Sequence, residues 1–376
     1  MRILDNERET INELLPGLDD KLSSYNLMEL EASNSKGIEL FKHHGGAGLL
    51  IPKDYGGKEA SAVDAVRVTA AIASRSPSLA IATTMHQFSV ASMIELAKTS
   101  EGFEWMLLDG IATDKRLMSS AFAEGMVSQS ILQPTMKAHF NGKNWVISGI
   151  KKPCSLSKSM DLMTASVAME HPEKGTVSGV ALIPANSNGI SIESFWQSNI
   201  LAGAESDAVV LENVEIPPEL LFELNSELEG ELETLQTLGF IWFELLLTAS
   251  YLGMAAALVE KVFDRNRGQI NEQVDLGIEI KSSQSLLEAI ANELDKGLGT
   301  NDNLAKTLVM RYSISKSIQR TTTKCVELLG GMDFIKSNET SYLLSAAQAI
   351  SFHPPSKASS DSGIHSWMLG NPFKIM

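Results

Sequence analysis

About a hundred residues with the texture of β-strands lie between two longer stretches of helical sequence. From about Met118 to Pro217, short runs of Val, Ile, Ser and Thr alternate with turn residues, which is typical of a β domain. Before residue 115 and after Pro217, apolar residues recur at the helical spacing of three and four. The 376 residues are therefore expected to be mainly α with a central β domain: an N-terminal helical domain at 1–117, a middle β domain at 118–222, and a C-terminal helical bundle with an irregular tail at 223–376.

One apolar run within the last of these domains is long enough to cross a bilayer. It extends from Leu238 to Val259 and is interrupted by Glu244. A carboxylate in the middle of a membrane span is costly, whereas a helix that is apolar on all sides is typical of the centre of a bundle or of a subunit interface. We expect a buried helix and no membrane span.

Charge and cysteine content exclude several classes of protein. The formal net charge is −15, and nucleic-acid binding relies on clustered basic residues, so no nucleic-acid partner is expected. Cys154 and Cys325 are far apart and lack the spacing of a disulfide framework or a zinc site, and the histidines lack metal-ligand spacing, so we expect no metal. The N-terminus lacks the apolar core of a signal peptide. These features predict a cytoplasmic protein.

Several short segments, taken in order, resemble the acyl-CoA dehydrogenase superfamily. They are Gly48–Gly57 (GLLIPKDYGG), Asn141–Lys151 (NGKNWVISGIK), Gly189–Ile192, Ser206–Asp207, Leu211–Pro217 and Leu328–Gly331 (LLGG). The resemblance covers nearly the whole chain and implies the acyl-CoA dehydrogenase-like fold. It also implies a bound FAD, oxidation of the CH–CH group of an acyl thioester of coenzyme A or a carrier protein, and a homotetramer or homodimer in which neighbouring subunits complete the flavin site.

The resemblance also implies which residues lie near the cofactor and the substrate. Ser155 falls where the family supplies a hydroxyl to the flavin ring, and Arg267 falls where it supplies an Arg to the pyrophosphate. The segment Ala123–Ser130 keeps only Glu124 of a family motif that lines the pocket. The implied cofactor residues are Phe122, Ala123, Ser128, Pro153, Cys154, Ser155, Arg267, Glu327, Gly330 and Gly331, and the implied substrate-pocket residues are His86 and Glu124.

The catalytic base of a dehydrogenase is missing from both places where the family carries it. Abstraction of an α-proton needs a carboxylate over the substrate, and the two aligned positions hold Pro354 and Phe243. Glu244 and His353 each lie one residue away and are the candidate catalytic residues. Because Glu244 lies in an apolar run, we expect it to be paired or to have a raised pKa.

The sequence around His353 favours a second interpretation. The segment Phe352–Lys357 and the ending Leu369–Pro372 resemble the flavin-dependent monooxygenases of this superfamily, in which a His near the flavin takes part in the oxygen chemistry. Such an enzyme would use FMN or FAD reduced by a partner reductase. A third alternative is a non-redox protein that keeps the fold for thioester binding. The electron acceptor or flavin reductase is not indicated by the sequence.

Overall fold

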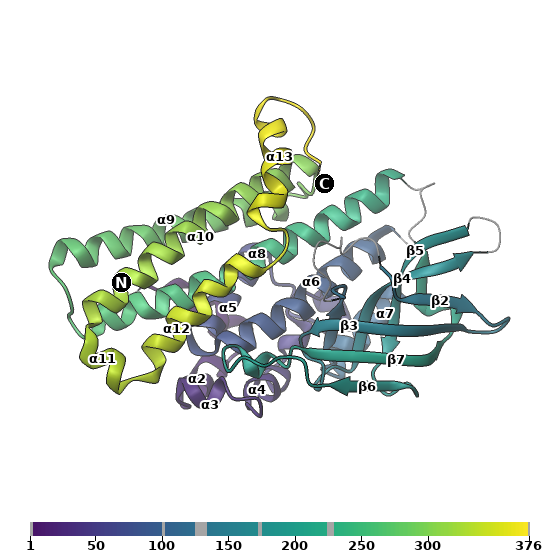
Figure 1. Cartoon of the computed structure of the whole chain (residues 1–376), viewed down its shortest axis with the longest axis horizontal. Coiled ribbons are helices and arrows are strands. Elements are labelled where there is room, and N and C mark those ends of the chain that lie inside the picture. The colour runs from purple at the N-terminus through teal and green to yellow at the C-terminus, as the bar shows by residue number, and fades with distance from the viewer. Residues whose placement is uncertain (1–2, 100–101, 125–133, 172–174, 224–228, 375–376) are drawn as a thin grey trace.

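A computed structural model describes the chain except for residues 1–2, 100–101, 125–133, 172–174, 224–228 and 375–376. Its order of elements is helical, then strand-rich, then helical (Figure 1). The mainly α architecture with a central β domain that the sequence predicts is therefore confirmed. The N-terminal helices are α1 (Asp5–Leu14), α2 (Leu18–Ser23), α3 (Leu27–Leu30), α4 (Gly37–His43), α5 (Ala62–Arg75), α6 (Pro77–Thr99) and α7 (Glu104–Thr113).

The middle of the chain forms a sheet of eight strands within the described residues. Its order is β6-β7-β3-β2-β4-β5-β8, and β1 pairs in parallel with β4 beside β2. Antiparallel neighbours β2 and β3 are joined at the Asn141–Gly142 turn, where Asn141 Oδ1 accepts from the N–H of Asn144 at 2.8 Å. The strands are β1 (Met118–Ala121), β2 (Lys137–Phe140), β3 (Trp145–Cys154), β4 (Leu162–His171), β5 (Gly175–Pro184), β6 (Ile190–Glu193), β7 (Asp207–Ile216) and β8 (Leu221–Glu223).

Three long helices form the second half, and shorter ones follow them. In Figure 1 α9 and α10 lie at the end of the molecule away from the sheet, and α8 runs beside them and continues toward the sheet. Helix α6 packs against both α8 and β1. They are α8 (Glu229–Asp264), α9 (Ile270–Asp295) and α10 (Asn301–Leu329), followed by α11 (Gly331–Lys336), α12 (Asn338–Gln348), the 3-10 turn η6 (Ala349–Phe352) and α13 (Lys357–Met368).

Local sequence explains where α5 begins and how closely it approaches α8. Ser61 Oγ accepts from the N–H of Asp64 at 3.0 Å, and the Asp64 carboxylate accepts from the N–H of Ser61 at 3.1 Å, which is a capping box. Gly253 of α8 faces α5, where a Cβ would lie 2.3 Å from the carbonyl oxygen of Ala70. The absence of a side chain at this glycine therefore allows the two helices to pack closely.

The apolar run predicted to be buried is the core of α8. Within the described residues, one helix is long and apolar enough to span a membrane, at Gln236–Asp264, and 83% of its most apolar window is buried inside the protein. It contacts α5, α6, α9, α10 and α12. The run is thus the central helix of the bundle, in agreement with the prediction.

The irregular C-terminal tail is the part of the fold prediction that is wrong. Residues 357–368 form α13. Ser356 caps this helix by accepting from the N–H of Ser359 at 3.2 Å, and Lys357 pairs with Asp361 one turn later at 2.5 Å. The cap and this pair favour a helix in a segment rich in Ser and Pro.

Candidate functional site

A buried ion pair between α8 and α10 lies at the centre of the bundle. Nη1 of Arg311 donates to both carboxylate oxygens of Glu244, at 3.0 and 2.9 Å, and both side chains are almost fully buried. Burial raises the pKa of Glu244 to about 7, against the lowering effect of the Arg311 charge. The expectation that Glu244 is paired or has a raised pKa is thus confirmed, and both of its oxygens are bound by Arg311.

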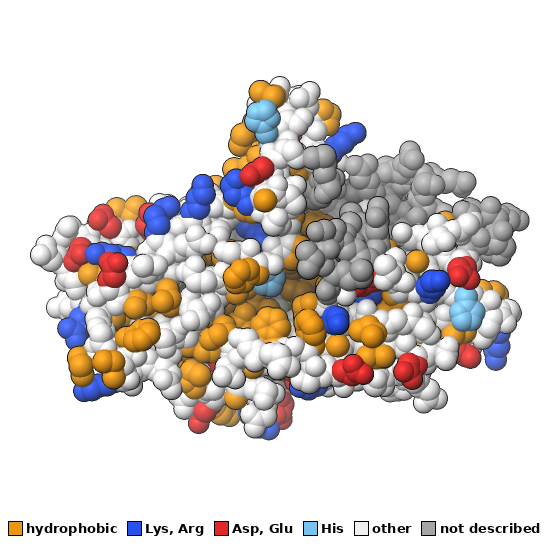
Figure 2. Space-filling model, viewed as in Figure 1, with side chains coloured by type: hydrophobic (Ala, Val, Ile, Leu, Met, Phe, Trp, Pro, Cys, Tyr) orange, Lys and Arg blue, Asp and Glu red, His pale blue; other side chains and the backbone are white. Residues whose placement is uncertain are grey.

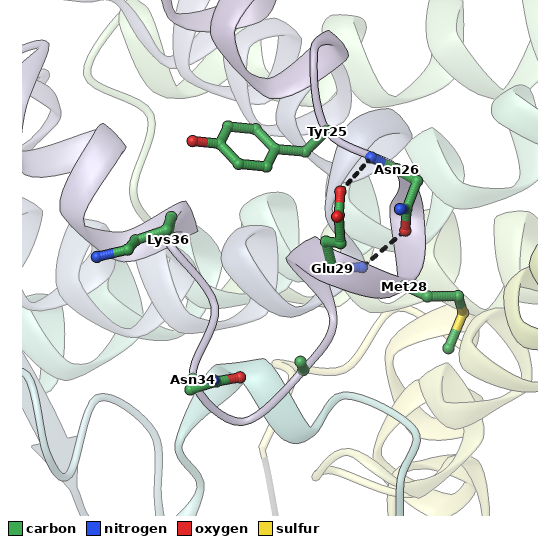
Figure 3. Close-up of a pocket in the computed structure, with 7 residues that line it drawn as sticks. Tyr25, Asn26, Met28, Glu29, Asn34 and Lys36 are labelled. Carbon is green, nitrogen blue, oxygen red and sulfur yellow. Dashed lines mark hydrogen bonds between the residues drawn. The ribbon is translucent and has the colours of Figure 1, made fainter.

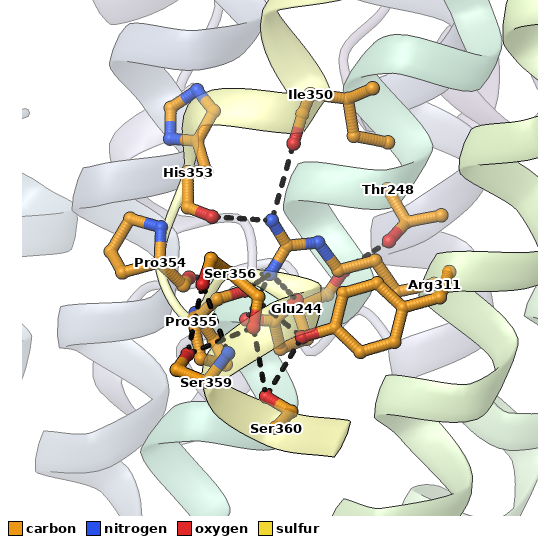
Figure 4. Close-up of polar contacts among 11 residues, drawn as sticks. Glu244, Thr248, Arg311, Ile350, His353, Pro354, Pro355, Ser356, Ser359 and Ser360 are labelled. Carbon is orange, nitrogen blue, oxygen red and sulfur yellow. Dashed lines mark hydrogen bonds and ion pairs between the residues drawn. The ribbon is translucent and has the colours of Figure 1, made fainter.

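The same guanidinium holds the segment that carries His353. Nη2 of Arg311 donates to the carbonyl oxygens of Ile350 at 3.2 Å and His353 at 2.7 Å, and Nη1 donates to those of Pro354 and Pro355, each at 3.3 Å (Figure 4). These contacts are to main-chain atoms. Arg311 therefore determines the path of the backbone from η6 to α13.

The imidazole of His353 points to α8, where it meets a tyrosine. Its Nε2 lies 2.6 Å from the hydroxyl of Tyr251, and the two rings are 5.6 Å apart between centroids. Tyr251 is fully buried and His353 is half-buried. Burial, with the charge of Arg311, lowers the pKa of His353 to about 3, and burial raises the pKa of Tyr251. Both groups are therefore uncharged at neutral pH.

The second position at which the superfamily carries a base is occupied by an aromatic ring. Phe243 of α8 packs edge-on against Phe88 of α6, with ring centroids 5.4 Å apart, and both side chains are half-buried. Figure 2 shows apolar side chains gathered in a hollow of the surface between the helices and the sheet. Neither this position nor Pro354 offers a carboxylate.

The described residues predicted to contact the flavin ring lie together at the C-terminal end of β3. The N–H of Lys152 donates to the carbonyl oxygen of Ala123 at 2.9 Å, so that Phe122 and Ala123 run beside the end of β3, where Pro153, Cys154 and Ser155 follow. Burial raises the pKa of the Cys154 thiol to about 12, which leaves it protonated and unreactive. Ser128 lies outside the described residues.

The hydroxyl groups at this place suit a flavin. Ser155 Oγ lies 3.0 Å from Ser206 Oγ, and both side chains are nearly buried. Since one hydroxyl donates to the other, one proton remains, and within the described part of the chain neither hydroxyl has another recorded partner. A hydroxyl donor at this place suits an acceptor such as a ring nitrogen of a flavin. Ser119 Oγ fixes the main chain by donating to the carbonyl of Ser155 at 2.6 Å.

Glu124, predicted to line the substrate pocket, is held by several donors. Its carboxylate accepts from the buried ammonium of Lys151 at 2.6 Å, from the Thr135 hydroxyl at 2.5 Å and from the N–H groups of Thr135 and Met136. Burial favours the neutral acid, yet these bonds, led by Lys151, lower the pKa of Glu124 to about 2. The carboxylate thus joins β3 to the start of β2.

His86, the other predicted pocket residue, has both ring nitrogens engaged. Its Nε2 lies 2.9 Å from the carbonyl oxygen of Ala47, and its Nδ1 accepts from the N–H of Met118 at 3.0 Å. The side chain is fully buried, and burial lowers its pKa to about 4. In this arrangement His86 connects α6 to β1 and to the loop before residue 48, and neither nitrogen is left for a substrate.

The remaining predicted cofactor residues lie at the opposite end of the bundle. Arg267, Glu327 and Gly331 are exposed, and Gly330 is half-buried with a positive φ of 82°. Leu329, next to Gly330, is roughly 27 Å from Arg311 along α10 at about 1.5 Å per residue. Gly330 and Gly331 therefore lie far along α10 from the ion pair of Arg311 with Glu244.

A surface pocket of about 580 Å³ lies apart from all the predicted site residues. It is lined by Tyr25, Asn26, Met28, Glu29, Ala32, Asn34 and Lys36 (Figure 3). Asn26 and Glu29 satisfy each other as a helix cap, at 2.9 and 3.0 Å, and Lys36 pairs with Glu39. Its polar groups thus serve the local fold.

Comparisons with known proteins identify the fold of the chain and its family. No protein-family model matches the chain. A solved complex of the dibenzothiophene monooxygenase TdsC from Paenibacillus sp. A11-2 with FMN and indole superposes with a TM-score of 0.86 at 16% identity, covering 98% of each chain. A glutaryl-coenzyme A dehydrogenase complex gives 0.77 at 16% identity, covering 100% of this chain and 97% of the other. The fold is that of the flavoproteins related to acyl-CoA dehydrogenases.

One relative is similar in sequence over its whole length. The isobutylamine N-hydroxylase of Streptomyces viridifaciens is 41% identical over 380 residues, which cover 100% of both proteins. The chain belongs to the acyl-CoA dehydrogenase superfamily, in the same family as this N-hydroxylase. A dibenzothiophene monooxygenase of Rhodococcus erythropolis is 26% identical over 235 residues, which cover 61% of this chain and 55% of that protein.

Two residues of the site, Arg311 and Tyr251, belong to no motif of the sequence. The helical repeat nevertheless indicates on which face of its helix each residue lies. Arg311 falls on the same helix face as the apolar Leu304, Leu308 and Ile318 of α10. Tyr251 comes seven residues, or about two turns, after Glu244 and so lies on the same face of α8. A charged residue on an apolar face indicates a buried pair.

Proposed function

We propose that this protein is a flavin-dependent monooxygenase that hydroxylates the nitrogen of a small aliphatic primary amine. The observation that carries the proposal is the group presented in place of the dehydrogenase base. That group is the uncharged imidazole of His353, while the adjacent carboxylate of Glu244 is bound at both oxygens by Arg311. The N-hydroxylase that is 41% identical over the full length supports the choice of reaction.

The reaction needs a reduced flavin and dioxygen as co-reactants. The amine, dioxygen and reduced FMN or FAD give the hydroxylamine, water and oxidised flavin, so one oxygen atom enters the N–O bond and the other leaves as water. The bound flavin supplies the two electrons. A separate reductase is the expected source of the reduced flavin, because no Rossmann or P-loop nucleotide motif occurs in the chain.

The residues of this chain then have distinct roles. Ser155, beside Ser206, donates a hydroxyl to the flavin ring, and the adjoining strand ends at Ala123 and Pro153 form its floor. His353 lies beside the reacting groups as a neutral hydrogen-bonding residue, since its pKa of about 3 keeps it uncharged. Phe88 and Phe243 provide apolar surface for the alkyl part of the amine.

The far end of the bundle fits a role in assembly. Apolar side chains are exposed there at Ile270 of α9 and at Met332 and Ile335 of α11. The ion pair of Lys324 with Glu272, at 3.0 Å, places the beginning of α9 beside the end of α10. We expect a second copy of the chain to cover this end and to bring the Arg267 and Gly330 region to its flavin, as a homodimer or homotetramer in the cytoplasm.

The test is oxygen transfer to an amine. The purified protein is supplied with FMN or FAD, a flavin reductase, reduced nicotinamide and labelled dioxygen, together with isobutylamine and a panel of other amines. One labelled oxygen atom in the hydroxylamine is expected. Bleaching of bound oxidised flavin by saturated acyl-CoA thioesters, with no oxygen transfer to any amine, would instead establish a CH–CH dehydrogenase. Failure to bind either flavin would support the non-redox alternative.

A further inference from the structure

The contact between Tyr251 and His353 determines where the imidazole carries its proton. Two arrangements satisfy the 2.6 Å separation. Either the tyrosine hydroxyl donates to Nε2, or Nε2–H donates to the tyrosine oxygen. They differ in what remains unbonded, because a neutral imidazole has one N–H and one acceptor nitrogen, and a tyrosine hydroxyl has a single proton.

Burial of Tyr251 decides between them. Its side chain is fully buried, and within the described residues its hydroxyl has no recorded partner other than His353. If Nε2–H were the donor, the hydroxyl proton would be buried without an acceptor, which disfavours this arrangement by about 5- to 150-fold. If the hydroxyl donates, the buried hydroxyl is satisfied, and the N–H left without a recorded partner is Nδ1–H of the half-buried imidazole. The hydroxyl therefore donates, and the imidazole proton lies on Nδ1.

The surroundings keep the imidazole in this neutral form. The charged groups packed near it are Arg311 of α10 and, through Arg311, Glu244 of α8. The guanidinium donates to the main-chain carbonyl of His353, so its positive charge lies close to the ring and disfavours a second proton. Nδ1 has no recorded partner in the described part of the chain, so this N–H is available as a donor.

We propose that Tyr251 is a positioning residue that holds His353 as its Nδ1–H tautomer and thereby provides an N–H donor to the reacting groups. The role toward substrate and flavin rests on the proposed monooxygenase function. The assignment of the proton does not, because it depends only on groups of this chain. Nothing in the superfamily motifs quoted above includes Tyr251.

The proton position is measurable on the flavin-free protein. Histidine-selective ¹³C and ¹⁵N labelling gives signals for seven imidazoles, and His353→Gln identifies the one of interest by its loss. The expected result is the Nδ1–H pattern in at least about a fivefold excess, which corresponds to the lower limit for an unpaired buried hydroxyl. A predominant Nε2–H pattern, or a protonated ring near neutral pH, would overturn the proposal.

Tyr251→Phe removes the donor, and Tyr312→Phe is the matched control. The hydroxyl of Tyr312 bonds the carbonyl of Pro355 at 3.0 Å and Ser360 at 2.9 Å, in the same segment but away from the imidazole. Tyr251→Phe should reduce the tautomer ratio about tenfold, and Tyr312→Phe should leave it unchanged. Equal ratios in Tyr251→Phe and the native protein would refute the role of Tyr251. If Tyr251→Phe does not fold, the native spectrum alone decides the tautomer.

The coupling of oxygen use to product completes the test. With reduced flavin supplied, Tyr251→Phe should release more hydrogen peroxide per hydroxylamine by about tenfold, with a smaller change in KM for the amine. A native protein with the Nδ1–H signal but no oxygen transfer would refute the proposed function and leave the proton assignment standing. Oxygen transfer with the Nε2–H signal would refute the proton assignment alone.

Discussion

Replacing Arg311 by methionine should destabilise the protein and make that loss depend on pH. The change removes the donor to both oxygens of Glu244 and to four main-chain carbonyls. Removing one member of a buried pair costs about 3–5 kcal/mol, because the other charge is left buried and unpaired. We expect a loss of this size in the free energy of unfolding at pH 8, measured by urea titration.

The pH dependence follows from the carboxyl that remains. Burial already raises the pKa of Glu244 to about 7, and without Arg311 the pKa rises further. The unfolded chain then releases this proton near pH 4.5, while the folded protein retains it. The stability of Arg311→Met should therefore fall as pH increases from about 4.5 to the folded pKa, by at most about 1.4 kcal/mol per pH unit.

A double variant isolates this effect from every other titrating group. Glu244→Gln with Arg311→Met has no ionisable group at the site, so the difference in unfolding free energy between single and double variants reports only the carboxyl. That difference should grow from about pH 5 to above pH 7. If it stays constant over this range, Glu244 is not buried as an unpaired acid, and the account of the ion pair is wrong.

Other predictions concern the cofactor, the imidazole and the packing. Ser155→Ala should weaken flavin binding by about 5–10-fold, as loss of one neutral hydrogen bond does, measured by fluorescence titration against a Ser148→Ala control on the exposed side of β3. Because the pKa of His353 is about 3, no titration of this ring should appear in product formation between about pH 5 and 8; a loss on acidification that His353→Asn abolishes would contradict this. Gly253→Ala should lower the free energy of unfolding by about 1–3 kcal/mol, since its Cβ would lie 2.3 Å from the carbonyl oxygen of Ala70. An unchanged urea midpoint would show that α5 and α8 separate freely.

The architecture was predictable because hydrophobic spacing changes where the fold changes. The first strand begins at Met118 and the last ends at Glu223, close to the limits read from the alternation of apolar and turn residues. The C-terminal helix was missed because its stabilisation comes from the cap at Ser356 and one ion pair rather than from an apolar face.

The site was predictable only in part, because its chemistry depends on contacts between distant segments. The burial of Glu244 followed from its apolar neighbours, but its partner Arg311 is 67 residues away. The resemblance to the superfamily places both His86 and His353 near the site. His86 has both ring nitrogens bonded within the core, whereas Nδ1 of His353 has no recorded partner in the described part of the chain. Sequence spacing carries no information on such differences, since they depend on which groups meet in space.

Arg311 holds its segment through main-chain oxygens, which every amino acid possesses. A substitution at position 353 or 354 therefore leaves the anchor intact, while it changes the functional group that the segment presents. Because the anchoring contacts are made to main-chain atoms, the side chains at these positions are able to change during evolution. One scaffold is then able to acquire an imidazole where its relatives have a carboxylate, without rebuilding the bundle around it.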